Sequence, residues 1–392
     1  MSSPVYFATA KQNRLRAEET LPAKLDLILE KLDIKSRVKD KSVAIKMHLG
    51  GNIGYSTIHP VFVRRLVKAI KEGGGRPFLT DTAGACETAH ERGYSHDTIG
   101  CPILPCAGPT EKYYKSFKKS FLQMTEWQIG GTLLDADFLI DFAHAKGHPT
   151  CGYGGVFKNI ALGAMTGTTR SALHDTMHQN RYWFEDKVLD EATRKAIMDA
   201  CPMGALVPDK EHPEKLHRHW EPCIQCKECV DAAPEGAITV EPQNFDAFQE
   251  ACAIGVSFVL DNFKPDRMVF INMVTDVTPV CDCFGFTGLP ILPDIGIFAG
   301  NDICAVEQAT LDELGKYEII AENVPLSMRL QPGEGLHPFQ VLHGHYKNPY
   351  KVIEFGAKYG CGDPNYKIVD VMPLYEPEAG KADDMTISAA DL

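Results

Sequence analysis

The sequence predicts an α/β protein in which a mainly parallel sheet is flanked by helices and a small α+β domain is inserted. Two observations predict this architecture. Amphipathic helices alternate with short apolar strands over most of the 392 residues, as in proteins whose parallel strands are joined by crossover helices. A stretch rich in Pro and Cys, from about 183 to 240, interrupts the alternation. We therefore expect an α/β domain in two parts, 1–185 and 244–392, with the inserted domain at 186–243.

Each expected element has a local reason. Apolar residues at helical spacing predict a helix over 21–32. A second helix is expected over 60–72, because Pro60 suits a first helical turn and three consecutive glycines follow Glu72. Strands are expected where short apolar runs are bounded by charged residues or glycine. These strands cover 42–47, 77–80, 138–142, 268–273 and 295–298, and a further helix is expected over 305–314.

Composition and charge narrow the class of partner. Lys and Arg number 40 against 52 Asp and Glu, and the net charge of −12 disfavours binding to nucleic acid or to an anionic membrane. No run approaches the ~20 apolar residues that a membrane helix needs, and the first residues lack the pattern of a signal peptide. We expect a cytoplasmic protein whose 13 cysteines are metal ligands, reactive thiols or core residues before they are disulfides.

Two segments of the insertion, 199–206 and 231–238, are copies of each other at an offset of 32 residues. The second copy is preceded by Cys-Ile-Gln-Cys-Lys-Glu-Cys over 223–229, a spacing that ligates a cubane iron-sulfur cluster. In bacterial ferredoxins a fourth Cys, directly before Pro, ligates the other cluster of the pair. The second copy has Ala233 in that place, whereas the first copy keeps Cys201 before Pro and lacks the other three cysteines.

This pattern resembles the bacterial dicluster ferredoxin domain, reduced to a single site. Loss of all four ligands of one cluster, with all four of the other kept, is not expected from random decay. We therefore predict one 4Fe-4S cluster that exchanges single electrons with an external low-potential donor or acceptor. Its ligands are Cys201, Cys223, Cys226 and Cys229. A zinc site is the alternative, since four thiolates also suit tetrahedral zinc.

Segments around the insertion resemble the family known as domain of unknown function 362, whose members are described as iron-sulfur-centre proteins. The resemblance implies no established reaction, but the family often carries a ferredoxin-like module. It rests on Ala-Ile-Lys-Met-His-Leu-Gly at 44–50, Phe-Leu-Thr-Asp-Thr at 78–82, Lys-Gly-His at 146–148, Gly-Gly-Val-Phe-Lys-Asn at 154–159, Thr-Pro-Val-Cys-Asp-Cys at 278–283 and Pro-Asp-Ile-Gly-Ile at 293–297.

Polar residues that follow the expected strands form a candidate crevice. In open α/β sheets, ligands bind beyond the carboxyl ends of the strands. Cys281 and Cys283 lie before a loop rich in Gly and Pro, and on an extended backbone their side chains would share a face. They could then hold a second metal or act as a redox dithiol. Lys46 and His48 alternate along a strand and would both point into the crevice.

A glycine-rich loop after the strand 138–142 supplies further candidates. Its glycines allow the backbone to approach a ligand closely and to present N–H groups to an anion. Part of the loop is similar to a segment of the lactate racemase family, in which a histidine and a lysine serve a nickel-pincer cofactor. We predict catalytic roles for Lys46, His48, His148, Lys158, Cys281 and Cys283, cofactor-binding roles for Gly154, Gly155, Asn159 and His174, and a place for His144 in the crevice lining. His174 and His178, spaced i,i+4, would share a helix face.

Taken together, these features predict an iron-sulfur oxidoreductase. One 4Fe-4S cluster would exchange electrons with a crevice that takes a small polar or anionic ligand. Two alternatives come from other classes. An electron-carrier or ligand-binding module without its own chemistry would have a crevice without converging titratable groups. A metal- or cofactor-dependent isomerase of the racemase type would use the cluster to stabilise the fold.

Overall fold

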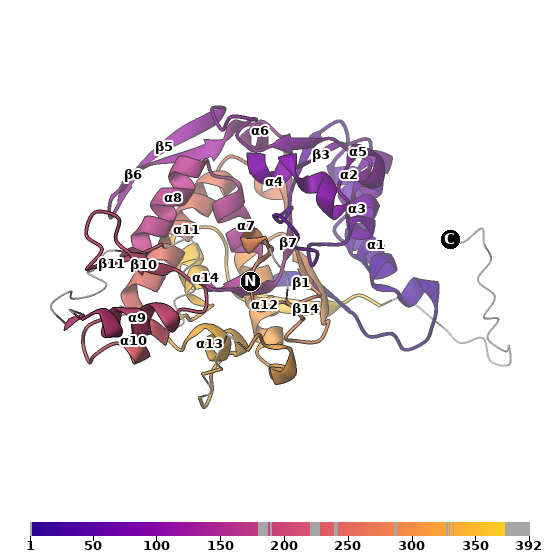
Figure 1. Cartoon of the computed structure of the whole chain (residues 1–392). Helices are drawn as coiled ribbons and strands as arrows, with labels where there is room; N and C mark the ends of the chain where they lie inside the picture. Colours follow the sequence, from indigo (N-terminus) through magenta and orange to yellow (C-terminus); the bar gives the residue numbers. More distant parts are fainter. Residues whose placement is uncertain are drawn as a thin grey trace.

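An eight-stranded sheet forms the centre of the molecule (Figure 1), which we describe from a computed structural model. In spatial order the strands are β14 (Tyr366–Asp370), β1 (Ser3–Thr9), β13 (Gly296–Gly300), β12 (Met268–Val274), β7 (Phe138–His144), β2 (Ser42–Lys46), β3 (Arg76–Asp81) and β4 (Ile103–Pro105). Only β13 runs antiparallel to its neighbours. The expected mainly parallel sheet is therefore confirmed. The structure describes residues 2–178, 187–188, 190–219, 228–238, 242–285, 288–326, 328, 330–331 and 333–372.

The order of the strands places a crevice at the carboxyl ends of β2 and β7. From β2 the chain passes through α3 (Pro60–Glu72) to β3 and then to β4, moving outward in one direction. It then returns to β7 on the other side of β2 and continues to β12. Where the direction of winding reverses, the connections on the two sides diverge and leave room for a ligand.

Helices cover both faces of the sheet, because side chains alternate in direction along each strand. In β7, Phe138, Ile140 and Phe142 pack with the helices α1 (Leu21–Lys31) and α3 on one face. On the opposite face Leu139 joins the larger core. That core is formed with α7 (Val156–Gly163), α11 (Pro242–Leu260), α12 (Ile303–Leu314) and α14 (Lys351–Lys358).

Shorter elements connect these layers. Outside the region expected to be inserted, the described residues also form the helices α2 (Ile34–Arg37), α4 (Ala83–Glu87), α5 (His96–Ile99), α6 (Gly131–Leu134), α8 (Gly167–Asp175) and α13 (Pro338–His343). Two-stranded pairs are formed by β5 (Tyr114–Phe121) with β6 (Met124–Gly130) and by β8 (Lys146–His148) with β9 (Gly152–Gly154). No helix in the described part of the chain is long and apolar enough to cross a membrane.

The expected elements are present within a few residues of their predicted bounds. The helix α3 has the predicted bounds, and α1, β2, β3, β7, β12 and α12 differ from their predictions by one or two residues at an end. The sequence did not predict β1, β14 or the long helix α11. The strand β13 was predicted, but its antiparallel direction was not.

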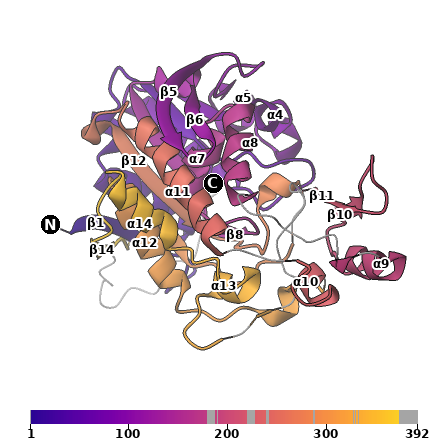
Figure 2. The same cartoon turned by 90° about the vertical axis from the view of Figure 1, so that its left-hand side faces the viewer.

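The region expected to be inserted contains small elements of its own. Its described part forms α9 (Glu191–Asp199), the antiparallel pair β10 (Leu206–Pro208) and β11 (Leu216–Arg218), and α10 (Glu228–Ala232), which lie together at one side of the molecule (Figure 2). These elements share a separate apolar cluster that includes Ile197, Leu206 and Leu216. The predicted boundaries of the inserted domain remain a prediction.

The duplicated segments share two local features, a helix end and a positive φ at one glycine. Each follows or includes the end of a helix, α9 in the first copy and α10 in the second. Gly204 and Gly236 occupy equivalent places, 32 residues apart in the sequence. Both have a positive φ, of 59° and 73°, a conformation that glycine adopts without steric cost. The sequence repeat is therefore accompanied by a repeat of local structure.

A buried carboxylate fixes the first turn of α7. Glu307, on α12, accepts hydrogen bonds from the backbone N–H groups of Val156 (3.3 Å) and Phe157 (3.2 Å) and from the Tyr153 hydroxyl (2.9 Å). Burial raises the pKa of Glu307 to about 7, against the effect of these donors. A Cβ atom at Gly155 would overlap this carboxylate. The close approach of Glu307 therefore requires glycine at position 155. Glu307 also occupies two backbone N–H groups at the start of α7 that could otherwise bind an anionic ligand.

We predict that Glu307→Gln destabilises the fold in a pH-dependent way. The N–H groups of the new side-chain amide would face the N–H and O–H donors that the carboxylate now accepts from. We expect this to lower the free energy of unfolding by about 1–3 kcal/mol. The folded-state pKa of Glu307 is raised, so its contribution to wild-type stability is present in full below pH 4.5 and is lost as the pH rises to about 7. The stability difference between wild type and variant should therefore shrink from pH 5 to pH 8. Urea unfolding at both pH values measures it.

Glu313→Gln is the matched control for this prediction. Glu313 lies on the same helix, where its carboxylate pairs with exposed Lys316 at 2.6 Å, so its loss should change stability by less than about 1 kcal/mol. A Glu307→Gln variant that loses equal stability at both pH values would contradict the raised pKa.

Candidate functional site

A cavity of about 940 Å³ lies at the carboxyl ends of β2, β3 and β7. Its size is within the range of small-molecule and cofactor sites. The lining contains every residue for which the sequence predicted a catalytic or cofactor-binding role outside the cluster motif. These residues are Lys46, His48, His148, Gly154, Gly155, Lys158, Asn159, His174, Cys281 and Cys283, and His144 lies with them. The structure brings these residues together around one space, and their chemical roles remain predictions.

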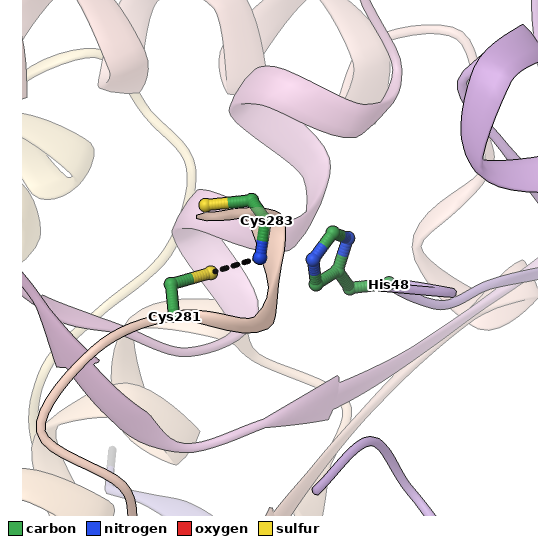
Figure 3. A group of neighbouring side chains, drawn as sticks. All are labelled: His48, Cys281 and Cys283. Atoms are coloured by element: carbon green, nitrogen blue, oxygen red, sulfur yellow. Dashed lines mark hydrogen bonds between the residues drawn. The ribbon is translucent and has the colours of Figure 1, made fainter. Parts of the chain in front are cut away.

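Three of these residues form a group that could hold a metal ion. His48, Cys281 and Cys283 each offer one ligand atom, and these atoms lie within 4.8 Å of one another. Figure 3 shows the His48 ring beside the two cysteines, which lie on the loop that follows β12. Imidazole and thiolate ligands suit zinc, nickel or iron. Three protein ligands would leave at least one coordination position open to a substrate, as in catalytic metal sites.

Asp81, the last residue of β3, fixes the orientation of the His48 ring. Its Oδ2 atom lies 3.2 Å from His48 Nδ1 and accepts a hydrogen bond from the Leu49 backbone N–H at 2.9 Å. Burial lowers the pKa of His48, but Asp81 and the nearby Cys281 sulfur raise it above its ordinary value on balance. His48 Nε2 is buried and makes no hydrogen bond with the described residues. It is therefore the nitrogen available to a metal.

A buried chain of polar contacts continues from Asp81 into the sheet. Lys46 Nζ lies 3.0 Å from Asp81 Oδ1 and donates to Asn159 Oδ1 at 2.9 Å. The Asn159 amide in turn donates to Asp141 at 2.5 Å. Burial opposes ionisation of Asp81, but Lys46, His48 and the Leu49 N–H together hold its pKa well below the ordinary range. Lys46 and Asn159 therefore serve chiefly to connect these buried polar groups. Both residues also line the cavity.

Lys158 lies on the first turn of α7, and its side chain extends from the helix to the two thiols. Its ammonium is 3.3 Å from the Cys281 sulfur and 3.9 Å from the Cys283 sulfur. Burial alone would lower the pKa of Lys158, but the neighbouring thiolate raises it well above its ordinary value. Burial raises the pKa of Cys281, yet its hydrogen bond with Cys283 and the charge of Lys158 lower it well below that of a free thiol. This arrangement favours a Cys281 thiolate beside a Lys158 ammonium.

The residue between the two cysteines anchors their loop. Asp282 is fully buried, accepts from Lys146 Nζ at 2.7 Å and from the Ser56 hydroxyl at 2.5 Å, and lies 3.4 Å from His144 Nδ1. Although burial opposes its ionisation, Lys146 holds the pKa of Asp282 well below its ordinary value. His144 Nε2 lies 2.7 Å from the Thr275 carbonyl, so that nitrogen carries a proton. Asp282 thereby attaches the loop to β8 through Lys146 and to the end of β7 through His144.

His148 is buried and lies beside Cys283, the more exposed of the two thiols. Its Nε2 atom is 3.6 Å from the Cys283 sulfur, and its ring is 5.9 Å from the Phe284 ring. Its Nδ1 atom accepts from the Thr150 backbone N–H at 3.2 Å. Burial lowers the pKa of His148 well below its ordinary value. The ring is therefore neutral near pH 7, with Nε2 directed towards Cys283.

Two local predictions were wrong. Cys281 has an extended backbone but Cys283 does not, because Asp282–Phe284 forms a 3-10 turn in which the Cys281 sulfur accepts the Cys283 N–H at 3.4 Å. The α-helix that carries His174 ends at Asp175 and tightens into a 3-10 turn over Thr176–His178, so the i,i+4 relation to His178 is not helical. His174 Nδ1 instead donates to the Arg170 carbonyl within α8.

The predicted cluster ligands lie partly outside the described residues. Cys223 and Cys226 are among the residues that the structure does not describe. Cys229 is buried and Cys201 packs partly buried against the same apolar cluster of the small region. The Cys201 sulfur accepts a hydrogen bond from the Ala205 N–H at 3.2 Å. The ligand set therefore remains a prediction.

Several residues that shape the cavity were not predicted. Asp81, Lys146 and Asp282 stood within quoted motifs, but no role was given to them. Each follows or ends a strand, which is the position where cavity residues are expected in this fold. Arg170 and Met203 also line the cavity. No motif distinguishes Arg170, and Met203 lies in the duplicated segment 199–206 without a predicted role.

The fold and the cavity define an α/β protein with a candidate thiolate and imidazole metal site at the carboxyl edge of its sheet. The chain belongs to the DUF362 family, described as a domain of unknown function, which matches residues 43–312. No curated protein matches the sequence.

Among solved structures, the chain is similar to the lactate racemase apoprotein from Thermoanaerobacterium thermosaccharolyticum. The sequence identity is 11%, the TM-score is 0.37, and the match covers 76% of this chain and 56% of that chain. The similarity is distant and assigns no activity to this chain.

We predict that His48→Gln abolishes high-affinity binding of Co²⁺ and that Asp81→Asn weakens it roughly 10- to 100-fold, as loss of a carboxylate hydrogen-bonded to a ligating histidine does at other metal sites. The absorption band of cobalt bound to thiolate measures the affinity. Asp26→Asn, which alters a remote pair with Arg65, should leave binding unchanged.

Two outcomes would contradict this site. One is equal cobalt affinity in the wild type and in His48→Gln. The other is a cobalt spectrum that persists in Cys281→Ser and so does not come from this thiol. Because Asp81→Asn leaves buried Lys46 without its carboxylate partner, unfolding of that variant is checked by circular dichroism, and His48→Gln then decides the result.

Proposed function

We propose that the protein is an iron-sulfur oxidoreductase in which one 4Fe-4S cluster exchanges electrons with the cavity. One observation carries the proposal: Met203 lines the cavity. Met203 follows the predicted cluster ligand Cys201 by two residues, a distance of at most about 7 Å along the chain. The proposed electron-transfer centre and the proposed reaction site would then be neighbours.

The small region fits the cluster in its chemistry. The described cysteines Cys201 and Cys229 belong to one apolar cluster, and burial and N–H groups donated to sulfur tune the potential of such centres. The N–H group of Ala205 already points at the Cys201 sulfur. Matching positive φ angles at Gly204 and Gly236 support a duplicated ferredoxin-like unit. When bound, the cluster would supply single electrons.

The cavity fits a reaction site better than a passive carrier surface. We expected a carrier to lack converging titratable groups, whereas His48, His148, Lys158, Cys281 and Cys283 lie around one space. The proposed ligand is small and polar or anionic, with Lys158 and His148 nearest to the thiols. The proposed partner is an external low-potential electron donor or acceptor.

We predict that anaerobically purified protein contains about four irons and four sulfides per chain, as one 4Fe-4S cluster requires. After reduction it should give an electron paramagnetic resonance signal of a reduced cubane. In Cys201→Ser the iron content should fall by more than half, because one of four ligands is lost. The variant Cys361→Ser changes a partly buried cysteine outside the predicted ligand set and should keep both iron and signal.

A protein with about one zinc per chain and no cubane signal would contradict the cluster. Iron that is retained in Cys201→Ser, with an unaltered signal, would contradict the ligand set.

A metal-dependent isomerase is the second candidate, and the His48, Cys281 and Cys283 group favours it. In that case the open coordination position, rather than electron flow, would serve the reaction. The two candidates differ in one measurement. An isomerase should convert its substrate without external reductant and with the cluster kept in one oxidation state, whereas the oxidoreductase should oxidise or reduce the cluster once for each electron transferred.

A further inference from the structure

The two thiols at the cavity differ in how they meet solvent. Cys281 is almost fully buried, at 1% exposure, whereas Cys283 is exposed. Both line the cavity. Only one residue separates them in the chain, and their sulfur atoms belong to a group whose ligand atoms all lie within 4.8 Å. Cys283 is thus accessible to a dissolved reagent, whereas Cys281 can react only with groups inside the protein.

We propose that Cys281 and Cys283 form a reversible dithiol and disulfide couple that exchanges electrons with substrates of the thiol or disulfide class, and that binds metal only in the reduced state. The proposal rests on the proposed redox use of the cavity and names a substrate class for it. It does not require the cluster, because thiol and disulfide exchange transfers two electrons directly between sulfur atoms.

The backbone holds the two cysteines within reach of a disulfide. Two residues span at most about 7 Å, close to the upper limit of about 6.8 Å between the Cα atoms of a disulfide. Asp282 cannot swing away, since its buried carboxylate is bound by Lys146 and Ser56. Formation of the bond therefore needs chiefly a rotation of the exposed Cys283 side chain towards Cys281.

A disulfide between Cys281 and Cys283 would close a small ring, and this ring explains why the disulfide would be easily reduced. A disulfide across a single residue departs from relaxed geometry, and strained disulfides are more easily reduced. Structural disulfides of secreted proteins resist reduction. The couple expected at the cavity is therefore labile and suited to exchange with small thiols.

The exchange balances in two steps. The Cys283 thiolate attacks one sulfur of an added disulfide, whose sulfur-sulfur bond breaks, and a mixed disulfide forms. The departing thiolate takes up the proton that Cys283 lost. The Cys281 thiolate then attacks the Cys283 sulfur, the second thiolate leaves and takes a proton from solvent, and the Cys281 to Cys283 bond forms. The protein dithiol is oxidised by two electrons, and one disulfide is reduced to two thiols.

Lys158 is a positioning residue for the second step. Its ammonium donates to the Cys281 sulfur at 3.3 Å, and the Cys283 backbone N–H donates to the same sulfur at 3.4 Å. Both contacts hold that sulfur at the base of the cavity, beside the position where a mixed disulfide on Cys283 would lie. Oxidation also removes both thiolates from the group with His48, so a metal would be released.

The test equilibrates the full-length chain, under anaerobic conditions, with mixtures of reduced and oxidised glutathione. Free thiols are then blocked with N-ethylmaleimide, and the peptide that contains 281–283 is analysed by mass spectrometry. We expect this peptide to lose both alkylation sites together, and to regain both when reduced glutathione is restored. In Cys281→Ser, a glutathione adduct should remain on Cys283. In Cys361→Ser, the result should match the wild type.

A second measurement tests the link to metal. Zinc bound before oxidation should slow loss of the two alkylation sites at least tenfold, and the oxidised protein should bind at least tenfold less zinc than the reduced protein. Lys158→Met should slow release of the glutathione adduct from Cys283 more than it slows formation of the adduct, because the ammonium lies 3.3 Å from the Cys281 sulfur and 3.9 Å from the Cys283 sulfur. A structural role of Lys158 alone would not separate these two rates.

Three results would overturn the proposal: two persistent free thiols under every mixture, a stable glutathione adduct on Cys283 in the wild type, or equal zinc binding before and after oxidation. Cys201→Ser separates this proposal from the proposed cluster. If that variant loses iron and keeps the couple, both proposals stand. If the wild type lacks a cluster but has the couple, only the proposed function fails.

Discussion

The buried ion pair between Lys146 and Asp282 is the contact on which the cavity depends. Its two charged groups lie 2.7 Å apart and are almost completely excluded from solvent. Removal of one partner from such a pair leaves a buried charge and typically costs about 3–5 kcal/mol. Because Asp282 lies between Cys281 and Cys283, the pair also decides where the two sulfur atoms lie. Asp81 acts similarly on the other side, where it pairs with Lys46 and orients His48. Two buried carboxylates, Asp81 and Asp282, thus hold the candidate metal ligands in place.

The charges in the cavity have a consequence for ligand binding. Three lysines line it, but Lys46 and Lys146 are paired with buried carboxylates, and Lys158 contacts the Cys281 sulfur. The reduced, metal-free cavity therefore offers little uncompensated positive charge. A metal bound by the thiolates would withdraw negative charge from Lys158 and make its ammonium available to an anionic ligand. We expect metal and anionic ligand to bind cooperatively for this reason.

Much of the sheet and the residues of the cavity could be predicted from the sequence, because parallel strands bury both faces and read as short apolar runs. Lys46, His48 and Cys281 were found since polar residues at strand ends meet at one edge. The orientation of β13 could not be predicted, because its apolar run has the same pattern in either direction. The 3-10 turn at Asp282 was missed because it depends on Lys146 and Ser56, which are distant in the sequence. The use of the α7 amides by Glu307 is likewise a tertiary contact that no local pattern contains.

The proposed cluster and the thiol site would share one cavity, which Met203, Cys281 and Cys283 line. To test this, the thiol site is loaded with paramagnetic Co²⁺, and the electron paramagnetic resonance of the reduced cluster is recorded in the same molecule. We expect a broadened, faster-relaxing cluster signal in the cobalt-loaded protein, compared with protein loaded with diamagnetic zinc. A cluster signal that is identical with cobalt and with zinc, while the thiolate absorption shows that cobalt is bound, would mean that the two centres do not share the cavity.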